Sequence, residues 1–244
     1  MGITKEITED NIARFEKLMG EVKGPGVEQL MDYIRKSDFY TAPASTKHHL
    51  SVEGGLLQHS LNVYDCLMSR MIKNPTGEYQ YIVAGNTVAT TDHESLIIMA
   101  LLHDICKTNF YTKGSKNQKT YDPDKVKKAE RWQIKHDNMG DFIWETIETY
   151  EVDDKVPYGH GEKSVMMIEE FMKLTAVERY AIRWHMGYTD DGNKLTLGQA
   201  IIKYPLILAL HIADQEASSF LEENTGNKFT GKQEKAEFQE AESI

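Results

Sequence analysis

Two side chains that commonly bind metals end an apolar segment of the chain. The pair His103-Asp104 follows a run of apolar residues at 96–102. Burying an imidazole beside an ionised carboxylate is costly unless a partner compensates it, and a divalent cation is the strongest such partner. On a helix, Lys107 lies on the same side and places an ammonium where a phosphate can bind. The pair indicates a metal site, although a core histidine bonded to a neighbouring carboxylate explains the dipeptide alone more simply.

Further residues of ligand type occur in segments whose hydrophobic periodicity predicts helices. These segments have apolar residues at three- and four-residue spacing, or lead into such a pattern. The residues are His59 in the glycine-opened helix 54–68, His160 in the turn 157–164, His185 at the end of the helix 176–184, and Asp214 in the helix 204–217. Four helical segments and one turn therefore each offer one or two metal-ligand side chains.

The order of these residues resembles that of the HD-domain metal-dependent phosphohydrolases. Residues 54–59, Gly-Gly-Leu-Leu-Gln-His, are similar to the first-ligand helix of that family. Residues 101–107, Leu-Leu-His-Asp-Ile-Cys-Lys, are similar to its name-giving motif, and residues 210–218 to its closing aspartate helix. The resemblance spans about residues 45–220, which is nearly the whole chain.

Two details bear on the number of metal ions and on helix packing. His160 and His185 stand where the members with two metal ions carry additional histidines, so the resemblance implies the dinuclear subset. In mononuclear relatives, histidines near these positions contact substrate phosphate instead, and that alternative stays open. Cys106 stands where many members have glycine, and we expect it to alter packing rather than ligation. On a regular helix it points away from the face that carries Asp104.

The resemblance also implies roles for the ligands. We expect Asp104 to bridge two ions, with one ion completed by His59, His103 and Asp214, and the second held by His160 and His185. A metal ion lowers the pKa of bound water from about 15.7 to near 7, and two ions about 3.5–4 Å apart can hold the substrate oxygens. One or two ions of iron, manganese, cobalt, zinc or magnesium are possible, since mixed histidine and carboxylate ligation does not single out one metal.

Lys107, His49 and Tyr158 are the expected substrate-binding residues, and Asp104 with Lys107 the expected catalytic pair. Lys107 is assigned to a phosphate oxygen, where its charge stabilises the transition state. His49 lies just before the first-ligand helix, and Tyr158 is one of several aromatic residues near the ligand motifs that can stack on a base, although core packing explains such rings equally well. His211, three residues before Asp214, is expected to be packed rather than ligating.

Composition favours one globular domain of a soluble protein. The 244 residues are 40% hydrophobic and 27% charged, and the net charge of -10 argues against binding long nucleic acid over the whole surface. The lysine-rich segment 113–135 is either a solvated loop or a phosphate-attracting rim. With two cysteines, no CxxC spacing and no signal or membrane-spanning pattern, we expect a cytoplasmic protein that does not contact membranes.

The pattern predicts an all-α fold, an HD-domain helical bundle with a small β-hairpin insertion. We expect a single domain over residues 1–244, with its core at about 45–220, N-terminal helices at 8–36 and a polar C-terminal tail at 222–244. The exception to helix is residues 142–152, where β-branched and aromatic residues alternate with polar ones and predict a hairpin strand. The position of its partner strand stays open, with residues 132–136 as the candidate. The oligomeric state is not predicted.

The implied function is hydrolysis of a phosphate ester or anhydride by metal-activated water. The substrate is a small phosphorylated molecule, most simply a nucleotide, whose base, sugar and phosphate number the sequence does not identify. The first alternative is a 3′–5′ exoribonuclease or phosphodiesterase, against which the acidic charge weighs. The others are a non-catalytic metal-binding regulatory module and a di-iron oxygenase.

Overall fold

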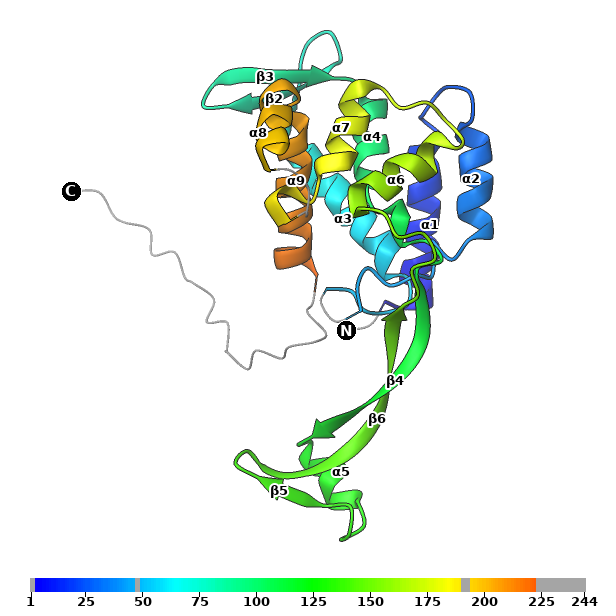
Figure 1. Ribbon diagram of the computed structural model, residues 1–244, viewed down its shortest axis with the longest axis vertical. Coiled ribbons are helices and arrows are strands. Elements are labelled where there is room, and N and C mark those ends of the chain that lie inside the picture. Colours follow the sequence, from blue (N-terminus) through cyan, green and yellow to red (C-terminus); the bar gives the residue numbers. More distant parts are fainter. Residues whose placement is uncertain (1–2, 47–48, 190–193, 223–244) are drawn as a thin grey trace, which may run out of the picture.

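A bundle of helices forms the body of the protein, and two small β-sheets extend from it (Figure 1). The structure is a computed structural model that describes residues 3–46, 49–189 and 194–222. Both sheets are three-stranded and antiparallel. The all-α expectation is therefore wrong, because the described residues form a mixed α and β fold in which the helices carry the core.

The described residues contain nine α-helices and three short helical turns. The helices are α1 (Lys5–Met19), α2 (Val27–Lys36), α3 (Gly55–Ser69), α4 (His93–Leu102), α5 (Pro123–Lys128), α6 (His160–Glu169), α7 (Ala176–Trp184), α8 (Lys194–Lys203) and α9 (Leu206–Glu216). The turns are η1 (Ile105–Lys107) and η2 (Gly187–Thr189), both 3-10, and η3 (Ala217–Leu221), a π-helical turn. No single helix among them is long and apolar enough to cross a membrane, and α8 with α9 and η3 meets that criterion only as a pair bent by 108°.

Capping side chains explain where several helices begin. The hydroxyl of Thr4 accepts a hydrogen bond from the Ile7 amide, so α1 starts three residues before the expected position 8. The carboxylate of Asp92 accepts from the Ser95 amide at 2.7 Å and starts α4. A capping box of Thr175 and Glu178 starts α7. Each cap satisfies amides that the first helical turn leaves unpaired.

Helix α4 lies at the centre of the bundle. Every residue from Ser95 to Leu102 is buried, so this helix has no polar face. It packs against α3 and α7, and α3 in turn packs against α9. Burial of one such leucine side chain contributes about 1.5–3 kcal/mol, so the apolar run fixes α4 among its neighbours. His103-Asp104, directly after this run, is consequently held where several helices meet.

The first sheet is a meander that the sequence analysis did not predict. It contains β1 (Met71–Lys73), β2 (Tyr79–Val83) and β3 (Asn86–Thr91), in the order β1-β2-β3. Ala84 and Gly85 join the last two strands, and both have positive φ, as a tight hairpin with matching twist requires. The sheet lies at the end of the bundle opposite to the second sheet (Figure 1).

The second sheet is an arm that extends away from the helical body (Figure 1). The predicted strand 142–152 is confirmed as part of β6 (Gly140–Val152). Its expected partner near 132–136 is partly right, because β5 (Lys135–Asp137) pairs with its start. The longer pairing is with β4 (Tyr111–Thr120), from Tyr111 opposite Val152 to Thr120 opposite Ile143. The lysine-rich segment 113–135 is therefore not simply a loop: it contains most of β4, together with α5.

Candidate metal centre

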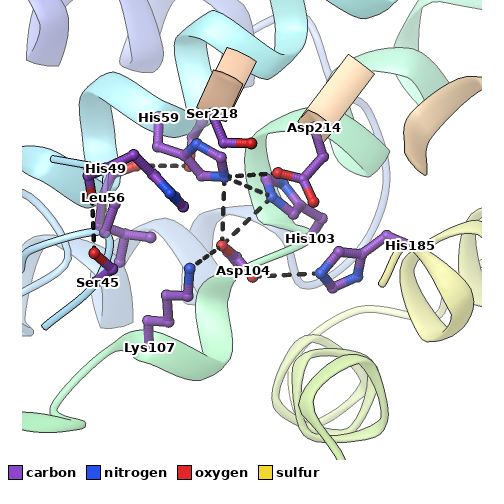
Figure 2. Close-up of polar contacts among 12 residues, drawn as sticks. Ser45, His49, Leu56, His59, His103, Asp104, Lys107, His185, Asp214 and Ser218 are labelled. Atoms are coloured by element: carbon purple, nitrogen blue, oxygen red, sulfur yellow. Dashed lines mark hydrogen bonds and ion pairs between the residues drawn. The ribbon is translucent and has the colours of Figure 1, made fainter. Parts of the chain in front are cut away.

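The six predicted ligands converge in one cluster between the helices, and Figure 2 labels all of them except His160. Their positions are His59 on α3, His103 and Asp104 directly after α4, His160 at the first residue of α6, His185 directly after α7, and Asp214 on α9. Five of these side chains are at most 10% exposed, and that of His160 is 28% exposed. The buried histidine and aspartate side chains can hold a metal ion.

One group of donors has the spacing that a single ion requires. The Nε2 of His59 lies 3.3 Å from the Nε2 of His103 and 3.3 Å from Oδ1 of Asp214. The Oδ2 of Asp104 lies 3.5 Å from the Nε2 of both histidines. Two nitrogen or oxygen donors that are each about 2.0–2.1 Å from one tetrahedral ion are about 3.4 Å apart. His59, His103 and Asp214 present one donor each within 4.8 Å of one another, so these three side chains could hold one ion, with Oδ2 of Asp104 beside the two histidines.

A second group of donors faces the other oxygen of Asp104. Its Oδ1 lies 2.5 Å from the Nε2 of His160 and 3.4 Å from the Nε2 of His185. The Nε2 of His185 is fully buried, and its contact with Oδ1 lacks hydrogen-bond geometry, so this atom has no hydrogen-bond partner among the described residues. Asp104 thus has one oxygen near each group of donors.

Backbone carbonyls orient two of the imidazole rings. The Nδ1 of His103 donates to the carbonyl of Ala100 at 2.8 Å, and the Nδ1 of His185 donates to that of Ile182 at 2.7 Å. Each ring then carries its proton on Nδ1 and directs the Nε2 lone pair into the cluster, as metal-binding histidines do. The helix ends themselves therefore set the tautomer needed for ligation.

The electrostatics of the cluster also call for a cation. Burial lowers the pKa of His103 to about 3, so that ring stays neutral. Burial opposes charge on His59 as well, but hydrogen bonds to Asp214 and Glu222 outweigh it and raise the pKa of His59 to about 10. Although burial favours the neutral acid, Lys107 and the neighbouring histidines hold the pKa of Asp104 well below its usual value. A cation on His59, either a proton or a metal ion, compensates the buried carboxylates.

Lys107 lies beside this cluster as expected. Its Nζ is 2.6 Å from Oδ2 of Asp104, and its side chain is 12% exposed (Figure 2). Helix α4 ends at Leu102, and the 3-10 turn η1 then keeps the lysine on the side of Asp104. Burial alone would lower the pKa of Lys107, but the charge of Asp104 raises it, so the ammonium remains protonated.

Glu222 is a site residue that the sequence analysis assigned to the polar tail. Its Oε1 accepts hydrogen bonds from the Nδ1 of His59 at 3.0 Å and from the Nδ2 of Asn62 at 2.9 Å. The residue is 6% exposed, and the hydrogen bond from His59 lowers its pKa despite burial. A carboxylate behind a ligating histidine fixes the ring and raises its basicity. No local pattern marks this residue, and the tail beyond it lies outside the described residues.

Replacing Glu222 with alanine is expected to weaken metal binding by about 10- to 100-fold, the usual effect of losing such a partner. The change leaves the Nδ1 of His59 without its acceptor, so the ring loses its fixed orientation. Competition with a chromogenic chelator measures the affinity. Glu28→Ala, on the exposed surface of α2, is the matched control. Equal affinities of the Glu222→Ala variant and the unaltered protein would contradict this role.

The remaining predicted histidines have distinct surroundings. His49 lies beside His59, with ring centroids 5.0 Å apart, and is 19% exposed (Figure 2). Burial, followed by the charge of His59, lowers the pKa of His49 to about 4, so it is neutral near pH 7. The Nδ1 of His211 donates to the carbonyl of His185 at 2.7 Å, which agrees with the expected packing role. His48, the residue before His49, lies outside the described residues.

Tyr158 does not lie with the donors. Its side chain is 55% exposed and lines a surface cavity of about 260 Å³ together with Met166 and Arg183, none of which is a predicted ligand. Its part in substrate binding therefore stays a prediction without a supporting contact, whereas His49 and Lys107 border the cluster.

The expected orientation of Cys106 is wrong. That expectation assumed a regular helix, but α4 ends at Leu102 and the backbone of Asp104 leaves the helical region, with φ −109° and ψ 17°. The Sγ of Cys106 consequently lies 3.5 Å from the Nδ1 of His160, on the side of the cluster. Burial and the charge of Asp104 raise the pKa of this thiol to about 12.

Close contact between α6 and α7 positions His160 beside His185. A Cβ added at Gly161 would lie 2.2 Å from the carbonyl oxygen of Arg183, so α6 can approach α7 only with glycine here. We expect Gly161→Ala to lower the free energy of unfolding by about 1–3 kcal/mol, as overpacking typically does. Thermal melting tests this, with Gly198→Ala as the control, since its added Cβ would meet no atom closer than 3.9 Å. An unchanged melting temperature for Gly161→Ala would contradict the close-packing argument.

Comparison of the chain with protein-family models, curated proteins and solved structures finds no match. The site must therefore be interpreted from its own geometry. That geometry establishes a buried histidine and aspartate cluster that can hold a metal ion, compatible with a site of the HD type.

Proposed function

We propose that the protein is a metal-dependent phosphohydrolase of the HD type, which cleaves a phosphate ester or anhydride of a nucleotide. The observation that carries this proposal is the position of Lys107. Its ammonium lies 2.6 Å from the carboxylate that both donor groups share. A fixed cation beside ligands for two metal ions is suited to a phosphoryl group, whose charge is spread over several oxygens.

The donor set fits two ions. His59, His103, Asp214 and Oδ2 of Asp104 would hold one, and His160, His185 and Oδ1 of Asp104 would hold the other. When bound, such ions supply an activated water and polarise the phosphoryl oxygens. Lys107 then binds a phosphoryl oxygen in exchange for its contact with Asp104. Because most donors are buried, the protein excludes bulk water from the reacting group.

The partly exposed residues define the side from which a substrate can enter. They are Lys107, His49 and His160, with side chains 12%, 19% and 28% exposed. Near Lys107, at the base of the arm, a cavity of about 260 Å³ is lined by Tyr111, Tyr150 and Lys113 among others. The two aromatic rings suit stacking on a base, which supports a nucleotide as the substrate, whereas Asp38 and Glu53 in the same lining offset the charge of Lys113.

The test begins with protein purified without added metal and its elemental analysis. Mononucleotides, phosphodiesters and a short single-stranded RNA are then assayed with iron, manganese and magnesium. We expect phosphate release from mononucleotides, dependent on metal and absent in Asp104→Ala. Faster cleavage of the RNA would favour the exoribonuclease alternative. Absence of turnover on every substrate, with both metal positions filled, would refute the proposed activity and favour a binding module.

A further inference from the structure

We infer that Cys106 is a ligand of the second metal position, together with His160, His185 and Oδ1 of Asp104. This position would then combine sulfur, nitrogen and oxygen donors and would select a borderline-soft divalent ion such as zinc, cobalt or iron. The inference rests on the metal centre of the proposed function, and it adds a residue to which the sequence pattern assigned only a packing effect.

The distances from the Cys106 sulfur to the ring of His160 agree with ligation of one ion by both side chains. The Sγ of Cys106 lies 3.5 Å from the Nδ1 of His160 and 3.7 Å from its Nε2. With bonds of about 2.3 Å to sulfur and about 2.0–2.1 Å to nitrogen, two donors on a tetrahedral ion are about 3.6 Å apart. Cys106, His160 and Asp104 also present one donor each within 4.8 Å of one another. The thiol is therefore at ligand distance without any change in the backbone.

The side chain of His185 independently supports a metal ion at this position. Its side chain is 1% exposed, and its Nε2 has no hydrogen-bond partner among the described residues although it lies 3.4 Å from Oδ1 of Asp104. Leaving a buried nitrogen unpaired is costly, so such an atom requires an explanation. The ring of His160 lies next to that of His185, with centroids 5.4 Å apart. This nitrogen and the thiol thus both lie near the carboxylate of Asp104.

The surroundings of the Cys106 thiol favour metal ligation over other roles. Cys106 is 2% exposed, and its backbone amide donates to the hydroxyl of Ser164 on α6, which ties η1 to the helix that carries His160. A thiol so buried is poorly placed to attack a substrate as a nucleophile. Metal binding deprotonates a coordinating thiol outright, so the ion itself supplies the thiolate that ligation needs.

A sulfur donor changes which metals the second position binds. Thiolate ligands favour zinc and iron, whereas carboxylate and water ligands suit magnesium and manganese. The first position, with histidine and carboxylate donors alone, has no such restriction. The two positions should therefore differ in metal preference, with the softer ion next to Cys106.

Cobalt(II) titration of the full chain tests this inference, because a cobalt–thiolate bond gives an intense charge-transfer band in the near ultraviolet. We expect this band in the unaltered protein and in Cys66→Ser, the matched control in the other cysteine, which lies on α3. We expect its loss in Cys106→Ser and Cys106→Gly. Both variants should also bind the second cobalt at least about ten-fold more weakly, since losing even an outer-shell partner costs 10- to 100-fold. Having two variants guards against misfolding of one, which thermal melting detects.

The outcomes separate this inference from the proposed function. If two cobalt ions bind without a charge-transfer band, or if the band persists in Cys106→Ser, Cys106 is not a ligand, although the metal centre stands. If no cobalt binds at all, both the sulfur ligand and the proposed metal-dependent function are overturned. A band without any phosphatase activity would support the sulfur ligand while refuting the proposed activity.

Discussion

Replacing Asp104 with asparagine is expected to lower phosphohydrolase turnover by at least about 10³-fold, and to remove metal from both positions. Each carboxylate oxygen faces a different group of donors, Oδ1 toward His160 and His185 and Oδ2 toward His59 and His103. An amide offers one neutral oxygen and an NH₂ group that does not ligate. Losing several kcal/mol of charge stabilisation in the transition state corresponds to about a thousand-fold in rate.

Two measurements check this expectation on the same preparations. Elemental analysis after dialysis gives the number of ions retained, and phosphate release from the best mononucleotide gives kcat/KM. Asp137→Asn is the control, because Asp137 is a paired aspartate on the arm, remote from the donors. If the Asp104→Asn variant kept two ions and turned over within ten-fold of the unaltered protein, Asp104 would not be a bridging ligand.

The convergence of these side chains could be predicted because several of them have a local signal. His103 and Asp104 are polar residues after a fully apolar run, and His59 follows two glycines that open a helix. The second of these, Gly55, is required by packing: an added Cβ would lie 2.1 Å from the carbonyl oxygen of Leu50, in the loop that carries His49. Local sequence therefore favours both the position of His59 and the close approach of the loop that carries His49.

Other parts of the site depend on tertiary contacts that no short pattern encodes. Glu222 reaches His59 across 163 residues of chain, and only the π-helical turn η3 brings it there. Cys106 faces the site because a 3-10 turn follows α4. An argument from helical periodicity assumes that the α-helix continues, so it cannot predict this change in backbone geometry. In both cases the missing information is the geometry at a helix end.

Strands β3 and β4 were missed for a different reason. Residues of β4, Tyr-Thr-Lys-Gly-Ser-Lys-Asn-Gln-Lys-Thr, are mostly polar and have low strand propensity. Ten paired positions with β6 hold this segment extended, and β6 alone carries the alternating pattern that predicts a strand. Residues of β3 are mostly exposed, so no buried face produces alternation there. These segments are strands because they pair with neighbouring strands, and their local sequence pattern does not predict them. A prediction from their sequences alone therefore led to an all-α fold.

Replacing Lys107 with methionine is expected to lower kcat by about 10²- to 10³-fold while both metal positions stay filled, in contrast to Asp104→Asn. Methionine keeps much of the side-chain length without the charge, and removing the ammonium from Oδ2 of Asp104 leaves that oxygen free for a metal ion. Elemental analysis and steady-state kinetics separate the two effects, with Lys5→Met on the exposed end of α1 as control. A Lys107→Met variant that lost its metal would show that the lysine positions Asp104. A Lys107→Met variant that kept full turnover would show that Lys107 does not contact the phosphoryl group. Loss of turnover with metal retained is the result that assigns the ammonium to the transition state.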